Sequence, residues 1–264
     1  MKAKINGISL NYRIDGPEHA PWLVFSNSLA TDLTMWDAEA AHFAEHYRVL
    51  RYDTRGHGGS ASSPAPYSLD QLVADAEGLL TELGVTKPVF VGLSLGGMTA
   101  MGLALKDPAR LRAIAVCAAR ADAPEGFGKM WDERISIART KGMGALVEST
   151  LVRWFTPDLL AQGPEFLEGV AGMIQSTSVD GYVGCANALA GLAYLPHLGR
   201  IKVPALFVAG ANDVAAPPAV MQVMSEKVAS SRFVELSPSG HLVNLQQPAK
   251  FRDTLDSFLG GLTA

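Results

Sequence analysis

A serine set between glycines carries the strongest chemical signal in the sequence. Residues Gly92 to Gly97 read G-L-S-L-G-G, with Ser94 at the centre, an apolar run at Val89–Val91 before them and a helix-compatible segment at Met98–Lys106 after them. In a tight strand-to-helix turn the serine hydroxyl points away from the sheet, and side chains at the glycines would collide with neighbouring elements. The helix N-terminus adds oriented N–H groups and positive potential. The pattern predicts Ser94 as a nucleophile; the alternative is a glycine-rich turn that happens to hold a serine.

A serine hydroxyl reacts poorly at neutral pH, so a nucleophilic role for Ser94 requires a positioned base. His241 lies in Ser239-Gly240-His241, just beyond the apolar run Phe233–Leu236, where a loop at the end of a strand is expected. The other downstream histidine, His197, precedes the return of strand-like sequence and is expected at the surface or in an insertion. His241 is therefore predicted to be the general base; the alternative is an ordinary loop histidine.

The base in turn needs an acid that fixes its tautomer and stabilises its protonated form. Asp213 follows the apolar stretch Ala205–Ala209 and is the favoured acid. Asp122, after the run Ile114–Cys117, is the competing residue. Asp213 could also serve only to form a turn.

A tetrahedral intermediate also needs two N–H donors aimed at its oxyanion. The backbone N–H of Leu95, directly after the nucleophile, is the first expected donor. The second is expected in the loop Ser26–Ala30 after the run Trp22–Phe25, at the N–H of Leu29.

The elements that must position these groups alternate between strand and helix patterns. Ile8–Ile14 alternates as a strand with one wet face does, and Leu69–Leu83 has helical spacing, with Ser68 and Gln71 as a capping pair and Gly84 at its end. Short apolar runs fit strands buried on both faces. These runs are Trp22–Phe25, Val49–Tyr52, Val89–Val91, Ile114–Cys117, Leu206–Val208 and Phe233–Leu236.

This alternation predicts an α/β fold with a mostly parallel central sheet and helices on both faces. It fails between about residues 122 and 196, where four segments look helical and no buried strand is evident. We expect a core of residues 1–121 and 197–264 with a helical cap at 122–196.

Composition excludes several other classes. A net charge of −4 offers no basic footprint for nucleic acid or an anionic membrane, although a local pocket can still bind an anion. The N-terminus lacks an apolar signal region, and no apolar run is long enough to span a bilayer, so a cytoplasmic protein is expected. Cys117 and Cys185 are expected to be free thiols.

No convincing metal or phosphate site is evident in the sequence. His42 and His46 are four residues apart without a third ligand, and the Asp53–Ser60 stretch offers only one aspartate and one histidine. That stretch is expected to be a structural loop with Arg55 tied to backbone carbonyls. Gly92–Gly97 lacks the lysine and Ser/Thr ending of a phosphate loop.

Over nearly its whole length the chain resembles the 3-oxoadipate enol-lactonases, which are bacterial α/β-hydrolases of aromatic catabolism. The loop before Trp36 and the stretches RWFTP and DGYVGC are more specific to this family than the G-x-S-x-G pattern. The matching segments are Leu23–Asp37, Tyr47–Ser60, Phe90–Met98, Arg153–Pro157, Asp180–Leu189 and the HLVNLQQP that begins at His241.

The resemblance implies a serine hydrolase of the α/β-hydrolase fold that opens a small carboxylate-bearing enol-lactone to a keto diacid, with no metal or cofactor. The substrate's carboxylate calls for a cation, and a bidentate arginine suits it. Arg134, in a W-x-x-R-I stretch that starts at Trp131, is the first choice, with Arg120 and Arg153 as alternatives. Trp131 and Trp154 are expected to line the substrate site.

Two other functions remain open at this point. One is a carboxylesterase or lactonase for another small acid derivative, which changes between Asp122 and Pro196 could produce. The other is a ligand-binding module that hydrolyses little, against which the intact serine, acid and histidine argue.

Overall fold

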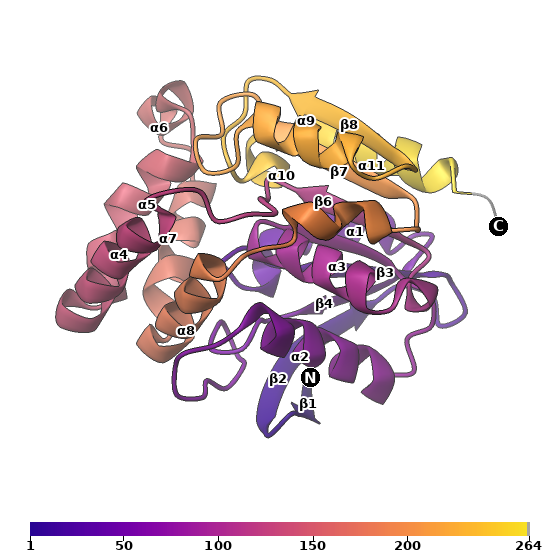
Figure 1. The fold of residues 1–264 in the computed structure, drawn as a ribbon, viewed down its shortest axis with the longest axis horizontal. Helices are drawn as coiled ribbons and strands as arrows, with labels where there is room; N and C mark the ends of the chain where they lie inside the picture. Colours follow the sequence, from indigo (N-terminus) through magenta and orange to yellow (C-terminus); the bar gives the residue numbers. More distant parts are fainter. Residues whose placement is uncertain (263–264) are drawn as a thin grey trace.

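The computed structural model describes residues 1–262 and contains an eight-stranded sheet in the order β1-β2-β4-β3-β5-β6-β7-β8 (Figure 1). β1 and β2 run antiparallel to their neighbours, and all pairs from β4 to β8 are parallel. The α/β class with a mostly parallel sheet is thereby confirmed. The strands are β1 (Lys2–Ile5), β2 (Ile8–Asp15), β3 (Trp22–Ser26), β4 (Arg48–Tyr52), β5 (Val89–Leu93), β6 (Ala113–Cys117), β7 (Ala205–Gly210) and β8 (Ser231–Leu236).

The central strands are apolar because helices cover both of their faces. Every residue of β5, β6 and β7 is buried, whereas β2 alternates between buried and partly exposed positions, as a strand with one wet face does. β1 was not expected from the sequence. It pairs with β2 through a tight turn in which Asn6 and Gly7 both have positive φ.

Strand register brings the ends of neighbouring strands to one edge of the sheet. Ser26 at the end of β3 pairs with Gly92 near the end of β5, and Gly210 at the end of β7 pairs with Leu236 at the end of β8. The loops after β3, β5, β7 and β8 therefore emerge on the same side. Ligands of open parallel sheets bind at this carboxyl edge.

Helices cover the two faces of the sheet. α2 and α3 pack together on one face, with α9 over β7 and β8 (Figure 1). α1 and α11 meet on the other face, where His42 Nε2 lies 2.7 Å from Asp256 Oδ2. These helices are α1 (Asp37–Phe43), α2 (Leu69–Glu82), α3 (Leu95–Lys106), α9 (Pro218–Glu226) and α11 (Pro248–Gly260), with short α10 (Val243–Gln246) before α11.

Five helices between β6 and β7 form a separate group to one side of the sheet (Figure 1). An isolated bridge between Asp122 and Ala193 joins the two ends of this segment. The division at residues 122 and 196 stays a prediction. The helices are α4 (Phe127–Lys141), α5 (Val147–Trp154), α6 (Pro157–Gln162), α7 (Phe166–Ser176) and α8 (Val179–Ala190).

The start of α8 rests directly on the loop after β4. Ser178 N–H and Oγ both donate to the carbonyl of Gly56, at 3.1 and 2.9 Å. A Cβ added to Gly181 would lie 2.4 Å from the same carbonyl oxygen, so glycine is required for this approach.

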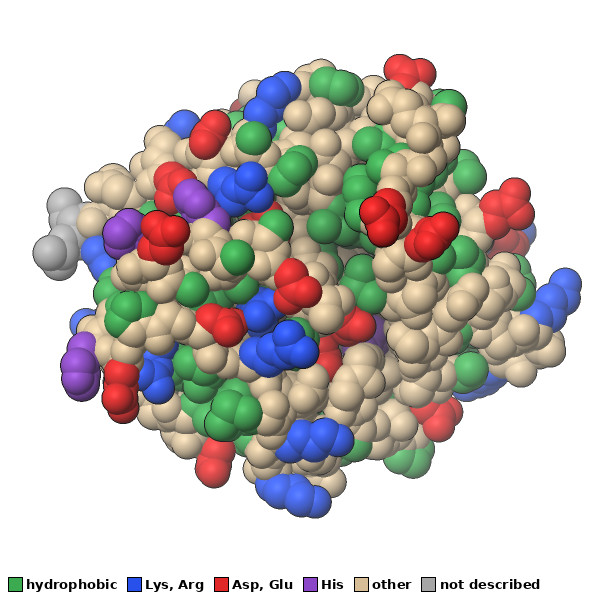
Figure 2. All heavy atoms as spheres, turned by 180° about the vertical axis from the view of Figure 1, so that it is seen from behind, with side chains coloured by type: hydrophobic (Ala, Val, Ile, Leu, Met, Phe, Trp, Pro, Cys, Tyr) green, Lys and Arg blue, Asp and Glu red, His purple; other side chains and the backbone are tan. Residues whose placement is uncertain are grey.

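Acidic and basic side chains are interspersed over the face shown in Figure 2, without a large field of one sign. Within residues 1–262, no helix combines the length and apolar character needed to cross a membrane. Cys117 and Cys185 are both buried and free.

Candidate active site

Ser94 occupies a sharp turn between β5 and α3, with φ 55° and ψ −111°. Its N–H donates to Cys117 O at 2.8 Å, and its carbonyl accepts from Met98 N at 3.0 Å. A Cβ at Gly92 would lie 2.0 Å from Gly96 O, and one at Gly96 would lie 2.1 Å from Ser26 O. The glycines around the serine are therefore required by close backbone contacts, which hold its positive-φ conformation in place.

The structure brings Asp213 and His241 together across the carboxyl edge of the sheet. Asp213 follows β7, His241 follows β8, and His241 Nδ1 lies 2.8 Å from Asp213 Oδ2. Asp122 Oδ1 instead lies 3.6 Å from a terminal nitrogen of Arg120. His197 is exposed in a short helix. Asp213 is thus the acid whose position fits that of an orienting group.

The ionisation of Asp213 follows from its surroundings. Burial raises the pKa of Asp213, but the charge and hydrogen bond of His241 and the N–H groups of Ala215 and Ala216 outweigh it and hold the pKa below its usual value. An ionised carboxylate only accepts, so His241 Nδ1 donates to it. When the ring carries a single proton, its Nε2 atom is then the acceptor, as a base requires.

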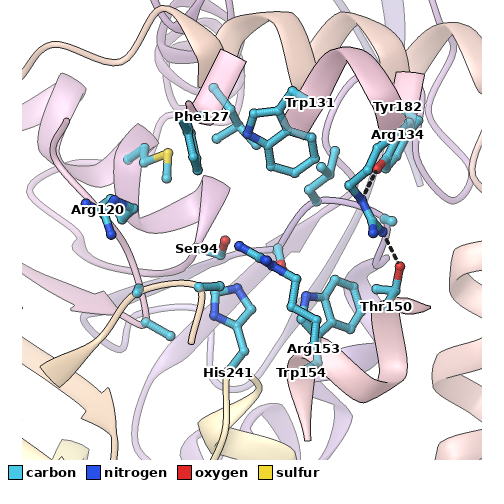
Figure 3. Close-up of a pocket in the computed structure, with 18 residues that line it drawn as sticks. Ser94, Arg120, Phe127, Trp131, Arg134, Thr150, Arg153, Trp154, Tyr182 and His241 are labelled. Carbon is cyan, nitrogen blue, oxygen red and sulfur yellow. Dashed lines mark hydrogen bonds between the residues drawn. The ribbon is translucent and has the colours of Figure 1, made fainter. Parts of the chain in front are cut away.

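Ser94 and His241 line the same pocket, and Figure 3 shows them facing each other across it. Among the hydrogen bonds of residues 1–262, none joins Ser94 Oγ to His241 Nε2. Catalytic hydrogen bonds are often longer before substrate binds and tighten in the reactive complex.

The histidine loop is held against the end of α5. His241 N–H donates to Trp154 O at 2.7 Å, and the two rings stack with centroids 6.2 Å apart. A Cβ at Gly240 would lie 2.3 Å from the same carbonyl oxygen. Glycine at this position lets α5 approach the loop that carries the histidine.

Two backbone N–H groups are available beside the serine. Among the backbone hydrogen bonds of the described residues, none uses the N–H of Leu29 or of Leu95 as donor. Leu95 is the first residue of α3, and Leu29 lines the pocket. Both N–H groups are thus free to donate to an oxyanion, and this role stays a prediction.

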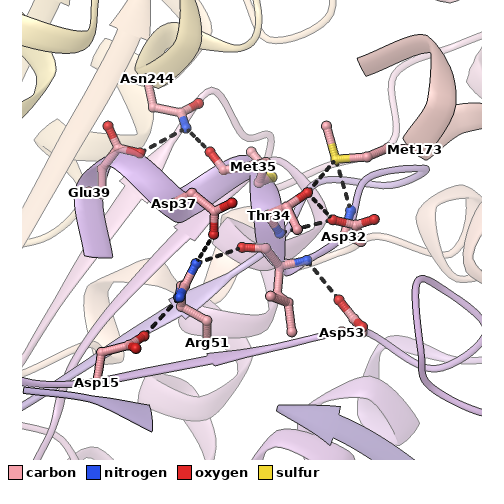
Figure 4. A network of polar contacts seen from close by, with 11 residues as sticks. Asp15, Asp32, Thr34, Met35, Asp37, Glu39, Arg51, Asp53, Met173 and Asn244 are labelled. Atoms are coloured by element: carbon pink, nitrogen blue, oxygen red, sulfur yellow. Dashed lines mark hydrogen bonds and ion pairs between the residues drawn. The ribbon is translucent and has the colours of Figure 1, made fainter. Parts of the chain in front are cut away.

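A polar network fixes the loop that contains Leu29 (Figure 4). Leu33 N–H donates to Asp53 Oδ1 at 2.7 Å, and Arg51 reaches the carbonyl of the same leucine at 3.5 Å. Asn244, three residues after His241, donates to Met35 O at 2.8 Å. The loop is thus tied both to the strand beside it and to the segment that carries the histidine.

The pocket wall is largely apolar but strongly biased in charge. Among its 18 lining residues are three arginines and no aspartate or glutamate. Aromatic rings from the cap helices form much of the remaining wall, and the predicted Trp131 and Trp154 are both part of it. The aromatic lining residues are Phe127, Trp131, Trp154 and Tyr182.

The three arginines differ in what they contact. Arg134 donates from Nε to Tyr182 Oη at 3.0 Å and from its terminal nitrogens to Ser149 and Thr150. Arg120 donates to the carbonyl of Asp122 at 3.4 Å. The guanidinium of Arg153 makes no hydrogen bond or ion pair within residues 1–262.

Phe127 and Tyr182 were not predicted as wall residues. A signal for Tyr182 was present, since it lies in the stretch DGYVGC that resembles the enol-lactonases. Phe127 begins α4 and packs edge-to-face on Trp131, with ring centroids 5.8 Å apart. Its position depends on where α4 starts, which the sequence pattern left open.

The expectation for Arg55 was wrong. Its guanidinium binds the buried carboxylate of Asp75 on α2, at 2.7 and 2.8 Å, instead of backbone carbonyls. His57, in the same loop, is fully buried with its Nδ1 3.0 Å from Arg55 O, and burial lowers its pKa to about 4. In the described part of the chain, no three His, Cys, Asp or Glu side chains cluster as metal ligands would.

The chain is similar to known proteins over most of its length. Residues 21–248 match the family model described as alpha/beta hydrolase fold. The chain is 35% identical to 3-oxoadipate enol-lactonase 2 of Acinetobacter baylyi, over 96% of this chain and 93% of that protein.

Two solved structures share the fold closely. The enol-lactonase from Burkholderia xenovorans LB400 has a TM-score of 0.94 and 40% identity, covering 98% of this chain and 100% of that one. A thermophilic esterase from Thermogutta terrifontis, solved with malate bound, has a TM-score of 0.93 and 26% identity, covering 100% and 99% of the two chains.

Proposed function

Because the chain belongs to the α/β-hydrolase family and, within it, to the 3-oxoadipate enol-lactonases, we propose that it opens a small enol-lactone bearing a free carboxylate. The product is the corresponding keto diacid, 3-oxoadipate in the relatives' named reaction. That the protein is a carboxylic-ester hydrolase acting on lactones or esters follows from its family; the particular substrate is our proposal.

The proposed chemistry uses the serine, histidine and aspartate in two stages. Ser94 Oγ attacks the lactone carbonyl while its proton passes to His241 Nε2, and the N–H groups of Leu29 and Leu95 stabilise the oxyanion. The bond from the carbonyl carbon to the enol oxygen then breaks, and that oxygen takes the proton from His241. The freed enol becomes a ketone that stays attached through the acyl chain.

Hydrolysis of the acyl-enzyme reverses these roles. His241 removes a proton from water, the resulting hydroxide attacks the acyl carbon, and Ser94 Oγ leaves with the proton that His241 returns. The carboxylate of Asp213 stabilises the imidazolium in both stages.

The observation that carries the proposal is the charge of the pocket beside Ser94. A protein of net charge −4 has three arginines and no acidic residue in this one wall. Cations in an apolar wall are costly unless an anion pairs with them. A substrate with a carboxylate supplies that anion.

Steady-state hydrolysis of synthetic enol-lactone, compared with simple aryl esters, tests the proposal. We expect kcat/KM to be higher for the enol-lactone by at least an order of magnitude. A kcat/KM that strongly favours the esters would refute it and would support the second candidate, a carboxylesterase for another small acid derivative. The observation that supports this second candidate is the 26% identity and shared fold with the Thermogutta terrifontis esterase.

A fluorophosphonate label distinguishes both enzymes from a module that only binds ligand. We expect labelling of the wild-type protein and none of Ser94→Ala. Equal labelling of both proteins would remove Ser94 from the mechanism.

A further inference from the structure

We propose that Arg153 is the residue that binds the substrate's carboxylate, and thereby selects anionic over neutral substrates. This inference rests on the proposed function, because it assigns the carboxylate of that substrate to one side chain. It differs from the sequence prediction, which favoured Arg134.

Arg134 is already engaged by other side chains. It donates to Tyr182 from Nε, and its two terminal nitrogens face hydroxyls of Ser149 and Thr150 on α5. Its side chain therefore already serves to join α4, α5 and α8. A substrate would have to displace these contacts to obtain a bidentate pair.

The guanidinium of Arg120 is likewise committed. It lies against its own loop, with Nε 3.4 Å from Asp122 O and a terminal nitrogen 3.6 Å from Asp122 Oδ1. The carboxylate of Asp122 already compensates its charge.

Arg153 is the pocket arginine that retains its full donor capacity. It lines the cavity and is partly buried, and its guanidinium forms neither a hydrogen bond nor an ion pair within residues 1–262. Burial lowers the pKa of Arg153, and the charges of Arg134 and Arg120 lower it further, whereas Asp213 and Tyr182 raise it. The lowering effects are the larger, so the protein compensates this positive charge only in part, and an anionic ligand would relieve it.

The position of Arg153 relative to the reacting atoms is fixed by the backbone. The next residue, Trp154, accepts the N–H of His241 through its carbonyl at 2.7 Å. Figure 3 shows the Arg153 side chain extending from α5 toward Ser94 and His241, while Arg134 turns away to Tyr182 and Thr150. A carboxylate bound to Arg153 would therefore lie a short chain length from the carbonyl that Ser94 attacks.

Two esters of equal chain length test this assignment: mono(4-nitrophenyl) adipate, which is an anion, and 4-nitrophenyl hexanoate, which is neutral. The readout is the ratio of kcat/KM for the adipate ester to that for the hexanoate ester. We expect the wild-type protein to prefer the adipate ester and Arg153→Met to reduce the ratio on the order of 100-fold, since truncating one partner of a buried charge pair has effects of this size. Arg153→Lys keeps the positive charge but not the two parallel N–H donors of a guanidinium. Its ratio should therefore lie between those of Arg153→Met and wild type.

Two further variants serve as comparisons. Arg134→Met should reduce the ratio less than Arg153→Met does. Arg139→Met, on the exposed side of α4, should leave the ratio unchanged. Competitive inhibition by free adipate of hexanoate ester hydrolysis gives an independent measure, and its inhibition constant should rise in Arg153→Met.

The outcomes separate this inference from the proposed function. The assignment of Arg153 is overturned if the wild-type preference for the adipate ester persists in Arg153→Met, or if it falls more in Arg134→Met than in Arg153→Met. Either result leaves the proposed function standing. Equal losses on both esters in Arg153→Met also overturn it. No wild-type preference for the anion would refute the carboxylate-bearing substrate itself.

Discussion

The buried carboxyl of Glu39 predicts how the free energy of unfolding of this protein depends on pH. Its side chain is fully buried in α1, and burial raises its pKa from the usual 4.5 to about 7. Asn244, three residues after His241, donates to Glu39 Oε2 at 3.4 Å. Among the described residues, Glu39 Oε1 and Asn244 Oδ1 are both buried without a hydrogen-bond partner. A protonated Glu39 adds an O–H donor to this site and removes its charge.

The sign and size of the effect follow from linkage. A carboxyl whose pKa is higher in the folded protein binds more protons when folded than when unfolded. Its contribution to the free energy of unfolding is complete below pH 4.5 and is lost as pH rises through about 7. At ~1.4 kcal/mol for each pKa unit, the loss amounts to about 3 kcal/mol.

Glu39→Gln keeps the shape of the neutral acid but cannot ionise. We expect its free energy of unfolding, relative to that of wild type, to rise by about 3 kcal/mol between pH 5 and pH 8, so the variant becomes the more stable of the two in comparison. In a chain of this length this corresponds to a relative rise in Tm of ~5 °C. Urea unfolding followed by tryptophan fluorescence at pH 5, 6, 7 and 8 measures the difference.

Glu45→Gln is the matched control, because Glu45 is exposed just beyond α1. Its difference from wild type should stay within about 0.5 kcal/mol at every pH. A difference in free energy of unfolding between Glu39→Gln and wild type that stays the same at every pH would refute the reasoning. It would mean that folding does not change the protonation of Glu39 in this pH range.

Four other substitutions test separate parts of the structure. Ser94→Ala should lower kcat by a factor on the order of 10³–10⁶ with an unchanged circular dichroism spectrum. Asp213→Asn should lower kcat less than Ser94→Ala, measured in the same assay, because the base and nucleophile remain. Gly240→Ala places a methyl group against the carbonyl that ends α5 and should cost about 1–3 kcal/mol in urea unfolding while lowering kcat. Asp75→Asn leaves the buried guanidinium of Arg55 unpaired and should cost about 3–5 kcal/mol, seen as a lower urea midpoint.

The parts of the fold that the sequence predicts well are those in which local pattern and burial agree. β5 is a run of apolar residues because both of its faces are covered, and α2 shows helical spacing because only one of its faces is. β1 was missed since four residues with little apolar character, Lys2–Ile5, do not resemble a strand alone. The Asn6-Gly7 pair after it was an available signal, because this pair favours the tight turn of a hairpin.

Side-chain partners far apart in the sequence were harder to foresee. Asp213 and His241 could be paired because the order of strands dictates which loops meet. The partner of Arg55 could not, because it depends on how α2 packs against the loop after β4. The difference between Arg134 and Arg153 depends on rotamers and on the hydroxyls that each can reach, which a pattern of residue types does not specify.

Main-chain contacts attach the cap to the core, among them those of α8 with Gly56 and Tyr67 and that of α5 with the loop at Gly240. None of these three depends on the identity of a cap side chain that faces the pocket. Substitutions on the inner surface of α4 can therefore alter the shape of the pocket while His241 keeps its support. A library of substitutions for new ester specificity is best placed on that helix. A cap transplanted from another hydrolase must form equally close main-chain contacts with the core at these attachment points.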